Sequence, residues 1–207
     1  MYYEPAELLR FFNNVSDPFW HAYFYLQYAY GCRTSETALI LDEDVNFKKH
    51  VIRIRRLKNP GETGYIETLH KAGPNVLQEV KEALKVKRKR KIEENPFLFG
   101  SKRAAKDGVR RLSQIRKLDS WQAISRFTAC RMYSKYIADQ KLPEHLTQSE
   151  TLRYTRAVVL LADGMPPEEV RDTLGHSSIS MTLRYLSAAD AIKGKLSKDF
   201  RAAGLGA

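Results

Sequence analysis

The first third of the chain spaces its apolar residues as helices do. Residues 5–14 contain one Leu-Leu pair and one Phe-Phe pair, spaced as on one face of a helix. Asp17-Pro18 is typical of the start of a second helix, because Asp caps helix N-termini and Pro fits the first turn. The body of this second helix is aromatic on nearly all sides, which predicts burial on several faces. Gly31 ends it, and residues 35–41 predict a third helix.

The segment VIRIRRL has a different period. Ile52 and Ile54 alternate with Arg53 and Arg55, which predicts a half-buried strand with these arginines on its polar side. Asn-Pro-Gly then indicates a turn, and residues 64–69 return as a second strand. We therefore expect an antiparallel hairpin.

Most of the remaining chain is again helical in pattern. Residues 74–91 predict a helix that ends in a basic run, residues 94–118 an exposed connector, and residues 121–137 another helix. Shorter helices, with Gly164 and Gly175 as stops, are predicted over 150–162, 167–174, 178–185 and from 188 onward. The predicted fold class is mainly α with a small antiparallel β-hairpin or sheet (α+β), and no second domain is indicated.

The composition says more about the binding partner of the protein than about its fold. The 207 residues include 35 Lys and Arg against 24 Asp and Glu, and the net charge of +11 favours a polyanion such as nucleic acid. The sequence lacks a secretory signal pattern and any apolar stretch of membrane-spanning length, so we expect a cytoplasmic protein. Cys32 and Cys130 lie far apart without metal-ligand spacing, so we expect reduced thiols, no metal site and no cofactor.

Three short motifs contain the candidate chemistry. In LGHSSISMTLRY, His176 follows a glycine stop and Tyr185 lies nine residues later. In LRYTRA, Arg153 lies 23 residues before His176, and in YGCRTSE, Glu36 lies three residues after Arg33. Separately, each motif has an ordinary structural explanation: a capped helix pair with a core tyrosine, a solvated helix end, and a surface ion pair.

In this order and at these distances, the motifs resemble the conserved boxes of the tyrosine recombinase (phage integrase) family, over about residues 3–190. The resemblance implies the family's catalytic-domain fold over residues 1–207, with the N-terminal core-binding domain absent. It implies a site-specific recombinase that cleaves and rejoins DNA through a 3′-phosphotyrosyl intermediate without a metal. It also implies a homo-oligomer, expected to be a tetramer, on paired double-stranded DNA sites and joined through the C-terminal helix.

The resemblance assigns a role to each matching position. Two guanidinium groups can stabilise the negative charge that gathers on phosphate oxygens, and a tyrosine can form a covalent phosphodiester that conserves the bond energy. The leaving 5′ oxygen needs a proton, which a lysine can supply as general acid. The roles map onto Arg33 and Arg153 for the phosphate, His176 as hydrogen-bond donor, Lys58 as general acid, Tyr185 as nucleophile and Glu36 as support.

Position 150 departs from the family pattern, which usually has a histidine three residues before the second arginine. Glu150 stands there, and it could accept the proton of the Tyr185 hydroxyl or orient an arginine. His145 would reach the site only if its loop folds back. This departure leaves open a second function, a DNA-binding recombinase-like protein with reduced or lost cleavage activity. A helix-turn-helix regulator built on residues 166–186 would leave the two arginine motifs unexplained.

Basic residues outside the motifs are candidates for contacts to the DNA backbone. A solvated helix end and loop would explain the same residues. These candidates are Lys87, Arg88, Lys89, Arg90, Lys102 and Arg103.

Overall fold

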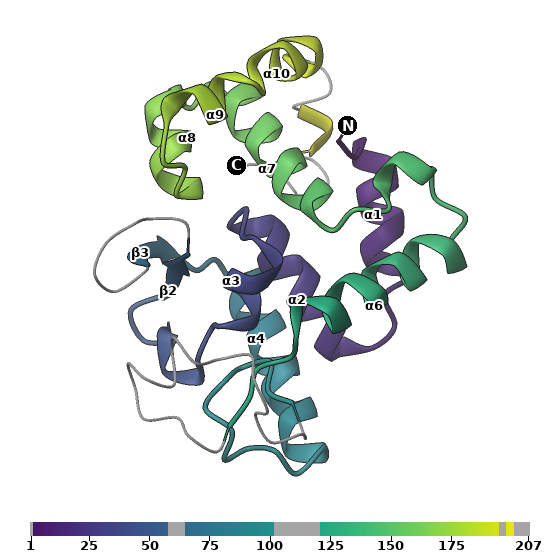
Figure 1. Ribbon diagram of the computed structural model, residues 1–207, viewed down its shortest axis with the longest axis vertical. Coiled ribbons are helices and arrows are strands. Elements are labelled where there is room, and N and C mark those ends of the chain that lie inside the picture. The colour runs from purple at the N-terminus through teal and green to yellow at the C-terminus, as the bar shows by residue number, and fades with distance from the viewer. Residues whose placement is uncertain (1, 58–64, 102–120, 195–197, 201–207) are drawn as a thin grey trace.

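The computed structural model describes residues 2–57, 65–101, 121–194 and 198–200 (Figure 1). The prediction of a mainly α fold with a small antiparallel sheet is confirmed. No helix within these ranges is both long and apolar enough to span a membrane. The elements are α1 (Pro5–Asn13), α2 (Pro18–Ala29), α3 (Thr34–Ala38), η1 (Asp42–Asp44), β1 (Val45–Asn46), β2 (Val51–Arg56), β3 (Ile66–Lys71), α4 (Pro74–Lys89), α6 (Arg126–Asp139), η2 (Glu144–Leu146), α7 (Glu150–Ala162), α8 (Pro167–Leu174), α9 (Ile179–Leu183) and α10 (Leu186–Ile192).

Helix α2 forms the centre of the hydrophobic core. The Phe24 ring lies 5.4 Å from the Tyr133 ring of α6 and 5.7 Å from the Phe11 ring of α1. On another side of α2, the Tyr23 ring lies 5.0 Å from the Phe99 ring. Aromatic rings bury large apolar areas and prefer such tilted and edge-to-face contacts, so α2 fixes the positions of α1, α6 and the segment around residue 99. The prediction of burial on several faces is confirmed.

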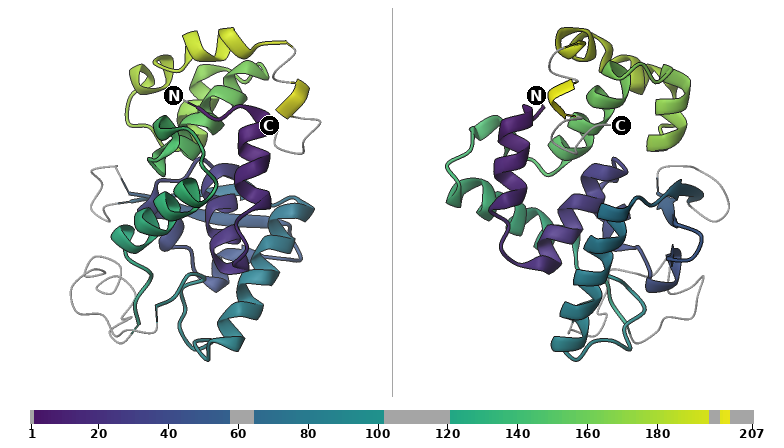
Figure 2. Two further views of the ribbon diagram at one scale, coloured as in Figure 1. Left: turned by 90° about the vertical axis from the view of Figure 1, so that its right-hand side faces the viewer. Right: turned by 180° about the vertical axis from the view of Figure 1, so that it is seen from behind.

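Helices α7–α10 gather at one end of the molecule, and α2, α3, α4 and the sheet lie at the other (Figures 1 and 2). Helix α1 runs along the side of both groups (Figure 2). Helix α7 packs on α2, α8 and α10, so it joins the two groups. The first motif lies in one group and the other two motifs lie in the other, which places the candidate site at their junction.

The sheet contains three antiparallel strands in the order β1-β2-β3, with Arg53 opposite Leu69. The helix predicted over residues 35–41 ends at Ala38, and the chain turns through η1 into β1. Asp44 stabilises this turn, because its Oδ2 accepts a hydrogen bond from the Leu41 backbone N–H at 2.8 Å. Arg55 was predicted on the polar side of its strand, yet it is buried, because its Nη2 donates to Asp44 Oδ1 at 2.8 Å.

Residues 95–101 correct the prediction of an exposed connector. Phe97, Leu98 and Phe99 are completely buried. The Ile124 backbone N–H donates to Phe99 O at 2.9 Å, so the chain just before α6 is extended, whereas a helix was predicted from residue 121. Helix α6 begins only after Ser125, whose Oγ accepts a hydrogen bond from the Thr128 N–H.

Candidate active site

The first motif forms a tight turn between α2 and α3. Gly31 has a φ of +55°, and a Cβ at this position would lie 2.1 Å from Leu174 Cδ2, so the end of α8 packs directly on the turn. Arg33 is the N-cap residue of α3, where its backbone N–H and Nη1 donate to Glu36 Oε2 and Oε1 at 2.8 and 2.7 Å. Because the Glu36 side chain is completely buried, this pair is not an ordinary surface ion pair.

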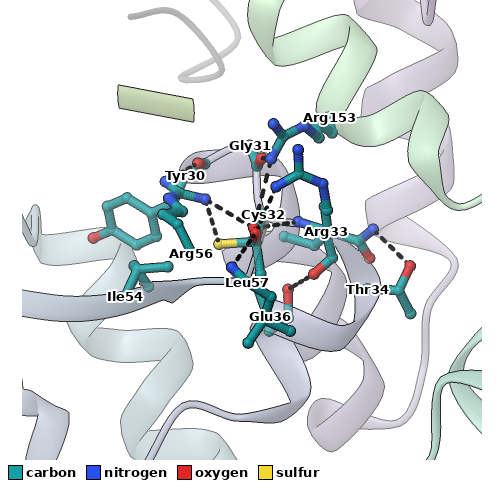
Figure 3. Close-up of polar contacts among 12 residues, drawn as sticks. Tyr30, Gly31, Cys32, Arg33, Thr34, Glu36, Ile54, Arg56, Leu57 and Arg153 are labelled. Carbon is teal, nitrogen blue, oxygen red and sulfur yellow. Dashed lines mark hydrogen bonds and ion pairs between the residues drawn. The ribbon is translucent and has the colours of Figure 1, made fainter. Parts of the chain in front are cut away.

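Glu36 brings together arginines from three parts of the chain (Figure 3). Arg56 of β2 donates Nη1 to Oε2 at 3.2 Å, and Arg153 Nη1 of α7 lies 3.5 Å from the same oxygen. The Leu57 backbone N–H donates to Oε1 at 3.2 Å. Burial raises the pKa of Glu36, but the charges of Arg56, Arg153 and Arg33 lower it by more than burial raises it. The resulting pKa lies below the ordinary value. Glu36 is therefore an anion at neutral pH.

Arg153 points from the first turns of α7 towards the first motif. Its Nη1 donates to Gly31 O at 2.7 Å, and its guanidinium lies next to that of Arg33 in Figure 3. Burial and the charge of Arg33 lower the pKa of Arg153 to about 10, which leaves it charged at neutral pH. Its Nη2 is buried and has no hydrogen-bond partner among the described residues. A buried cationic donor without a partner is costly, and an anion bound here would satisfy it.

His176 follows the end of α8, where Gly175 ends the helix as predicted and adopts the left-handed conformation, with a φ of +67°. The residue is 7% exposed, and its Nδ1 lies 2.8 Å from Thr182 Oγ1. Burial and the charges of Arg153 and Arg33 lower the pKa of His176 to about 3, so the ring is neutral at pH 7. When Nδ1 accepts the Thr182 hydroxyl proton, Nε2 carries the ring proton and can donate to an anion.

Tyr185 lies at a break between two helices, whereas the sequence predicted it as the last residue of a helix over 178–185. Helix α9 ends at Leu183, and Tyr185 is the N-cap residue of α10. Its backbone N–H donates to Thr182 O, three residues earlier, which is a tighter turn than that of an α-helix. The Tyr185 ring lies 6.0 Å from the His176 ring and meets the Tyr154 ring edge-to-face at 4.7 Å.

Burial raises the pKa of Tyr185, and the nearby charge of Arg153 only partly offsets this effect. The phenol is therefore protonated at neutral pH, and an attack by its oxygen requires a proton acceptor. Glu150, the first residue of α7, is close enough that its charge also raises the pKa of Tyr185. His145 is exposed and lines a separate shallow pocket with the N-terminal segment. The general-acid candidate, Lys58, lies outside the described residues.

Arg56 is the site residue that the sequence analysis missed. It continues the apolar face of the strand formed by Ile52 and Ile54, and its side chain is 2% exposed. An arginine in the position expected for a buried apolar residue is a signal that a partner lies inside the fold. Here that partner is Glu36.

Lys87, predicted to contact DNA, is buried, and the prediction is wrong for this residue. Its Nζ donates to Asn95 O at 2.7 Å and pairs with Asp42. Lys87 lies one helical turn after the buried Ala83, so it faces the core. Its hydrogen bond to Asn95 O joins α4 to the segment that follows this helix.

The other basic candidates differ in exposure. Arg90 is half-buried, because its guanidinium pairs with Asp17 at 2.8 Å and covers the Phe19 ring. Arg88 and Lys89 are exposed, and their contact with DNA stays a prediction. Lys102 and Arg103 lie outside the described residues.

Neither cysteine suggests a metal or disulfide role. Cys32 and Cys130 are free thiols, and burial raises the pKa of Cys32 to about 11. Within the described ranges, no three His, Cys, Asp or Glu side chains are grouped so that they could hold a metal ion.

Known proteins with similar sequences are tyrosine recombinases. Tyrosine recombinase XerC of Chlamydia caviae is 29% identical over 168 residues, which are 81% of this chain and 46% of the relative. XerC of Thermodesulfovibrio yellowstonii is 27% identical over 164 residues, which are 77% of this chain and 47% of the relative. The chain thus spans about half the length of these curated relatives.

Solved structures of recombinases share the fold. The crystal structure of XerA recombinase matches with a TM-score of 0.68 at 18% identity, over 98% of this chain and 64% of that one. XerH site-specific recombinase, bound to its palindromic difH substrate, matches with a TM-score of 0.68 at 17% identity, over 99% of this chain and 53% of that one. The model of the phage integrase family matches residues 4–191. Because that match covers nearly the whole chain, this protein belongs to the phage integrase family.

Proposed function

We propose that this chain carries the catalytic site of a site-specific recombinase that cleaves and rejoins DNA through a 3′-phosphotyrosyl intermediate. One observation carries the proposal: Arg153 presents a buried, unpartnered cationic donor next to Arg33, and its charge is close enough to His176 and Tyr185 to act on the pKa of both. A DNA phosphodiester has the charge and the acceptor oxygens that such a group of donors requires.

In the proposed first step, the Tyr185 oxygen attacks the phosphorus and forms a new P–O bond. The bond between the phosphorus and the 5′ oxygen breaks in the same step. The phenol proton passes to Glu150, and the departing 5′ oxygen takes a proton from Lys58. Arg33 and Arg153 stabilise the negative charge that accumulates on the non-bridging oxygens.

Rejoining is the reverse reaction on the same groups. A 5′ hydroxyl attacks the phosphotyrosine, gives its proton to the lysine and releases the tyrosine, which recovers its proton from the glutamate. The covalent link conserves the energy of the broken bond, so the proposed reaction needs no nucleotide cofactor.

The proposed partner is double-stranded DNA; the Tn1549 transposon integrase, a solved structure that matches this chain with a TM-score of 0.63, is in complex with a circular intermediate DNA. The net charge of +11 supports this partner. Assembly as a tetramer through the C-terminal helix stays a prediction. Helix α10 packs on α7 of its own chain, where Ala189 and Ile192 are buried.

Capture of the covalent intermediate tests the proposal. The protein first selects its DNA site from a randomised pool, and the selected site is then made with a nick that lets the short cleaved product diffuse away. We expect wild type to accumulate a protein–DNA adduct and Tyr185→Phe to form none. Tyr136→Phe is the matched control, because Tyr136 is a half-buried tyrosine of α6 outside the site, and it should form the adduct at the wild-type rate. Site-specific binding by wild type without any adduct would instead support a protein that no longer cleaves.

A further inference from the structure

Arg56 makes hydrogen bonds to three separate parts of the chain. Its Nη1 donates to Glu36 Oε2 at 3.2 Å. Its Nη2 donates to Tyr30 O, at the end of α2, at 2.9 Å and to Thr173 O, in the last turn of α8, at 2.5 Å. One side chain from β2 therefore joins the segment that carries the first arginine motif, which Figure 3 shows, to the helix that precedes His176.

The stem of Arg56 supports the turn that presents His176. A Cβ on Gly175 would lie 2.6 Å from Arg56 Cγ and 2.8 Å from Arg56 Cβ. The glycine backbone thus rests directly on the arginine stem, and the position of the following histidine depends on where that stem lies.

A neutral histidine borders the guanidinium on the β3 side. His70 Nε2 lies 3.4 Å from Arg56 Nη2 and 2.8 Å from Thr68 Oγ1. Burial and the charge of Arg56 lower the pKa of His70 to about 4, so its ring is uncharged at neutral pH and can accept from the arginine. The groups facing Arg56 are thus one carboxylate, two backbone carbonyls, the Cys32 thiol at 3.5 Å and this neutral ring.

We propose that Arg56 is a positioning residue of the recombinase site. It fixes Glu36, which holds Arg33 and Arg153, in a set position relative to the end of α8, which presents His176. This inference rests on the proposed function. Buried ion pairs are often no more stabilising than apolar residues of equal volume, so stability alone does not account for a buried arginine here.

Arg55 provides a matched control from the same strand. Its side chain is 1% exposed, and it also forms a buried ion pair, with Asp44. Because neighbouring side chains of a strand point to opposite faces, Arg55 is directed away from Glu36. Loss of either arginine should destabilise the fold, whereas only loss of Arg56 should disturb the site.

The first experiment measures adduct formation at saturating DNA for Arg56→Met, Arg56→Lys and Arg55→Met, each at the same margin below its own Tm. We expect Arg56→Met to slow adduct formation by about 100-fold, since small displacements of positioning groups have effects of this size, while its DNA affinity stays close to that of wild type. Arg56→Lys should recover part of the rate, because its ammonium keeps the charge near Glu36 but lacks the guanidinium fork. Arg55→Met should react at nearly the wild-type rate.

A second measurement, by NMR without DNA, follows the titration of His176 in the same variants. Removal of the Arg56 charge should move the pKa of His176 upward from about 3, and removal of Arg55 should not. Equal behaviour of Arg56→Met and Arg55→Met in both measurements would overturn the inference. If wild type forms no adduct, the proposed function fails; the inference about Arg56 then stands only if the NMR shifts of the Gly175 and His176 backbone change in Arg56→Met and not in Arg55→Met.

Discussion

The substitution Glu36→Gln replaces a completely buried carboxylate that lies among three arginines with a neutral amide of nearly the same shape. The amide oxygen can still accept two of the four hydrogen bonds that the carboxylate accepts from Arg33, Arg56 and Leu57. The three positive charges then face one another without a compensating anion. We therefore expect a large loss of stability and a displaced site.

The size of the loss follows from the burial of the group. Removal of one partner of a buried ion pair costs roughly 3–5 kcal/mol. For a chain of this length, each kcal/mol lowers the Tm by roughly 2–4 °C, so the expected decrease is about 6–20 °C. The amide oxygen that remains places the expected value towards the lower end of this range.

Thermal unfolding followed by circular dichroism measures this loss, with Glu67→Gln as the matched control. Glu67 also lies near two arginines of β2, at 3.6 and 3.5 Å, but its side chain is 39% exposed. Exposed pairs contribute less than about 1 kcal/mol, and salt screens them. Glu67→Gln should therefore have a small effect that disappears in concentrated salt, whereas the effect of Glu36→Gln should persist.

The pH dependence provides a second check. The pKa of folded Glu36 lies below its ordinary value of 4.5, so the unfolded chain binds the proton first as the pH falls. The stabilisation is complete above about pH 4.5 and is lost as the pH falls through the lower folded pKa. The Tm difference between wild type and Glu36→Gln should thus shrink in acid. A difference no larger than that of Glu67→Gln, or one that grows in acid, would refute the reasoning.

Three further predictions concern the surroundings of the site. Gly175→Ala should lower the free energy of unfolding in urea more than Gly164→Ala does, because both glycines have positive φ but only Gly175 has a side chain within reach of an added Cβ; equal losses would contradict this. Thr182→Val should alter the NMR shifts of the His176 imidazole nitrogens and slow adduct formation. Unchanged shifts would show that the Thr182 hydroxyl does not set the tautomer of His176. Lys87→Met should lower the Tm without changing the salt dependence of DNA binding, because Lys87 is buried. Lys89→Gln, at an exposed position, should reduce the slope of the logarithm of the DNA-binding constant against the logarithm of the salt concentration by about 0.9. The opposite pattern would contradict the conclusion that Lys87 faces the core and the prediction that Lys89 contacts DNA.

Local sequence rules predicted most of the helices and the positions of the motifs. Asp17 caps α2, with its Oδ1 accepting from Phe19 N–H, and Gly175 ends α8 in the left-handed conformation, because caps and stops depend on neighbouring residues alone. The resemblance of the motifs to the family's conserved boxes identified Arg33 and Arg153, whose side chains the structure places beside one carboxylate, that of Glu36. Their catalytic roles remain predictions for the experiments above.

The burial of charged residues could not be predicted, because it depends on partners far away in the sequence. Arg56 is buried because it pairs with Glu36, 20 residues earlier, and Lys87 is buried because it pairs with Asp42, 45 residues earlier. The same limit explains the error before α6, where the chain is extended because it pairs with Phe99. Helical periodicity reports only on neighbours along the chain, so it cannot distinguish such a segment from the first turn of a helix.

The sequence predicted a helix that ends at Tyr185 rather than at Leu183, and the role of Tyr185 as the nucleophile stays a prediction that rests on the family resemblance. The pattern of residues 178–185 is helical, and no glycine or proline marks the end of α9 at Leu183. The tight turn follows instead from packing, where the Tyr185 ring meets the Tyr154 ring of α7 and α10 packs on the same helix. Tyr185 therefore lies at a backbone turn, close enough to Arg153 for that charge to offset part of the increase in its pKa that burial causes.

The central claim is that Tyr185 becomes covalently attached to DNA. The most direct test digests the trapped protein–DNA adduct with a protease and identifies the linked residue and the DNA end by mass spectrometry. We predict that the peptide containing Tyr185 is linked to a DNA 3′ phosphate and that the downstream fragment of the same cleaved strand has a free 5′ hydroxyl. Attachment to another residue, or to a 5′ phosphate, would contradict the assignment of this tyrosine as the nucleophile.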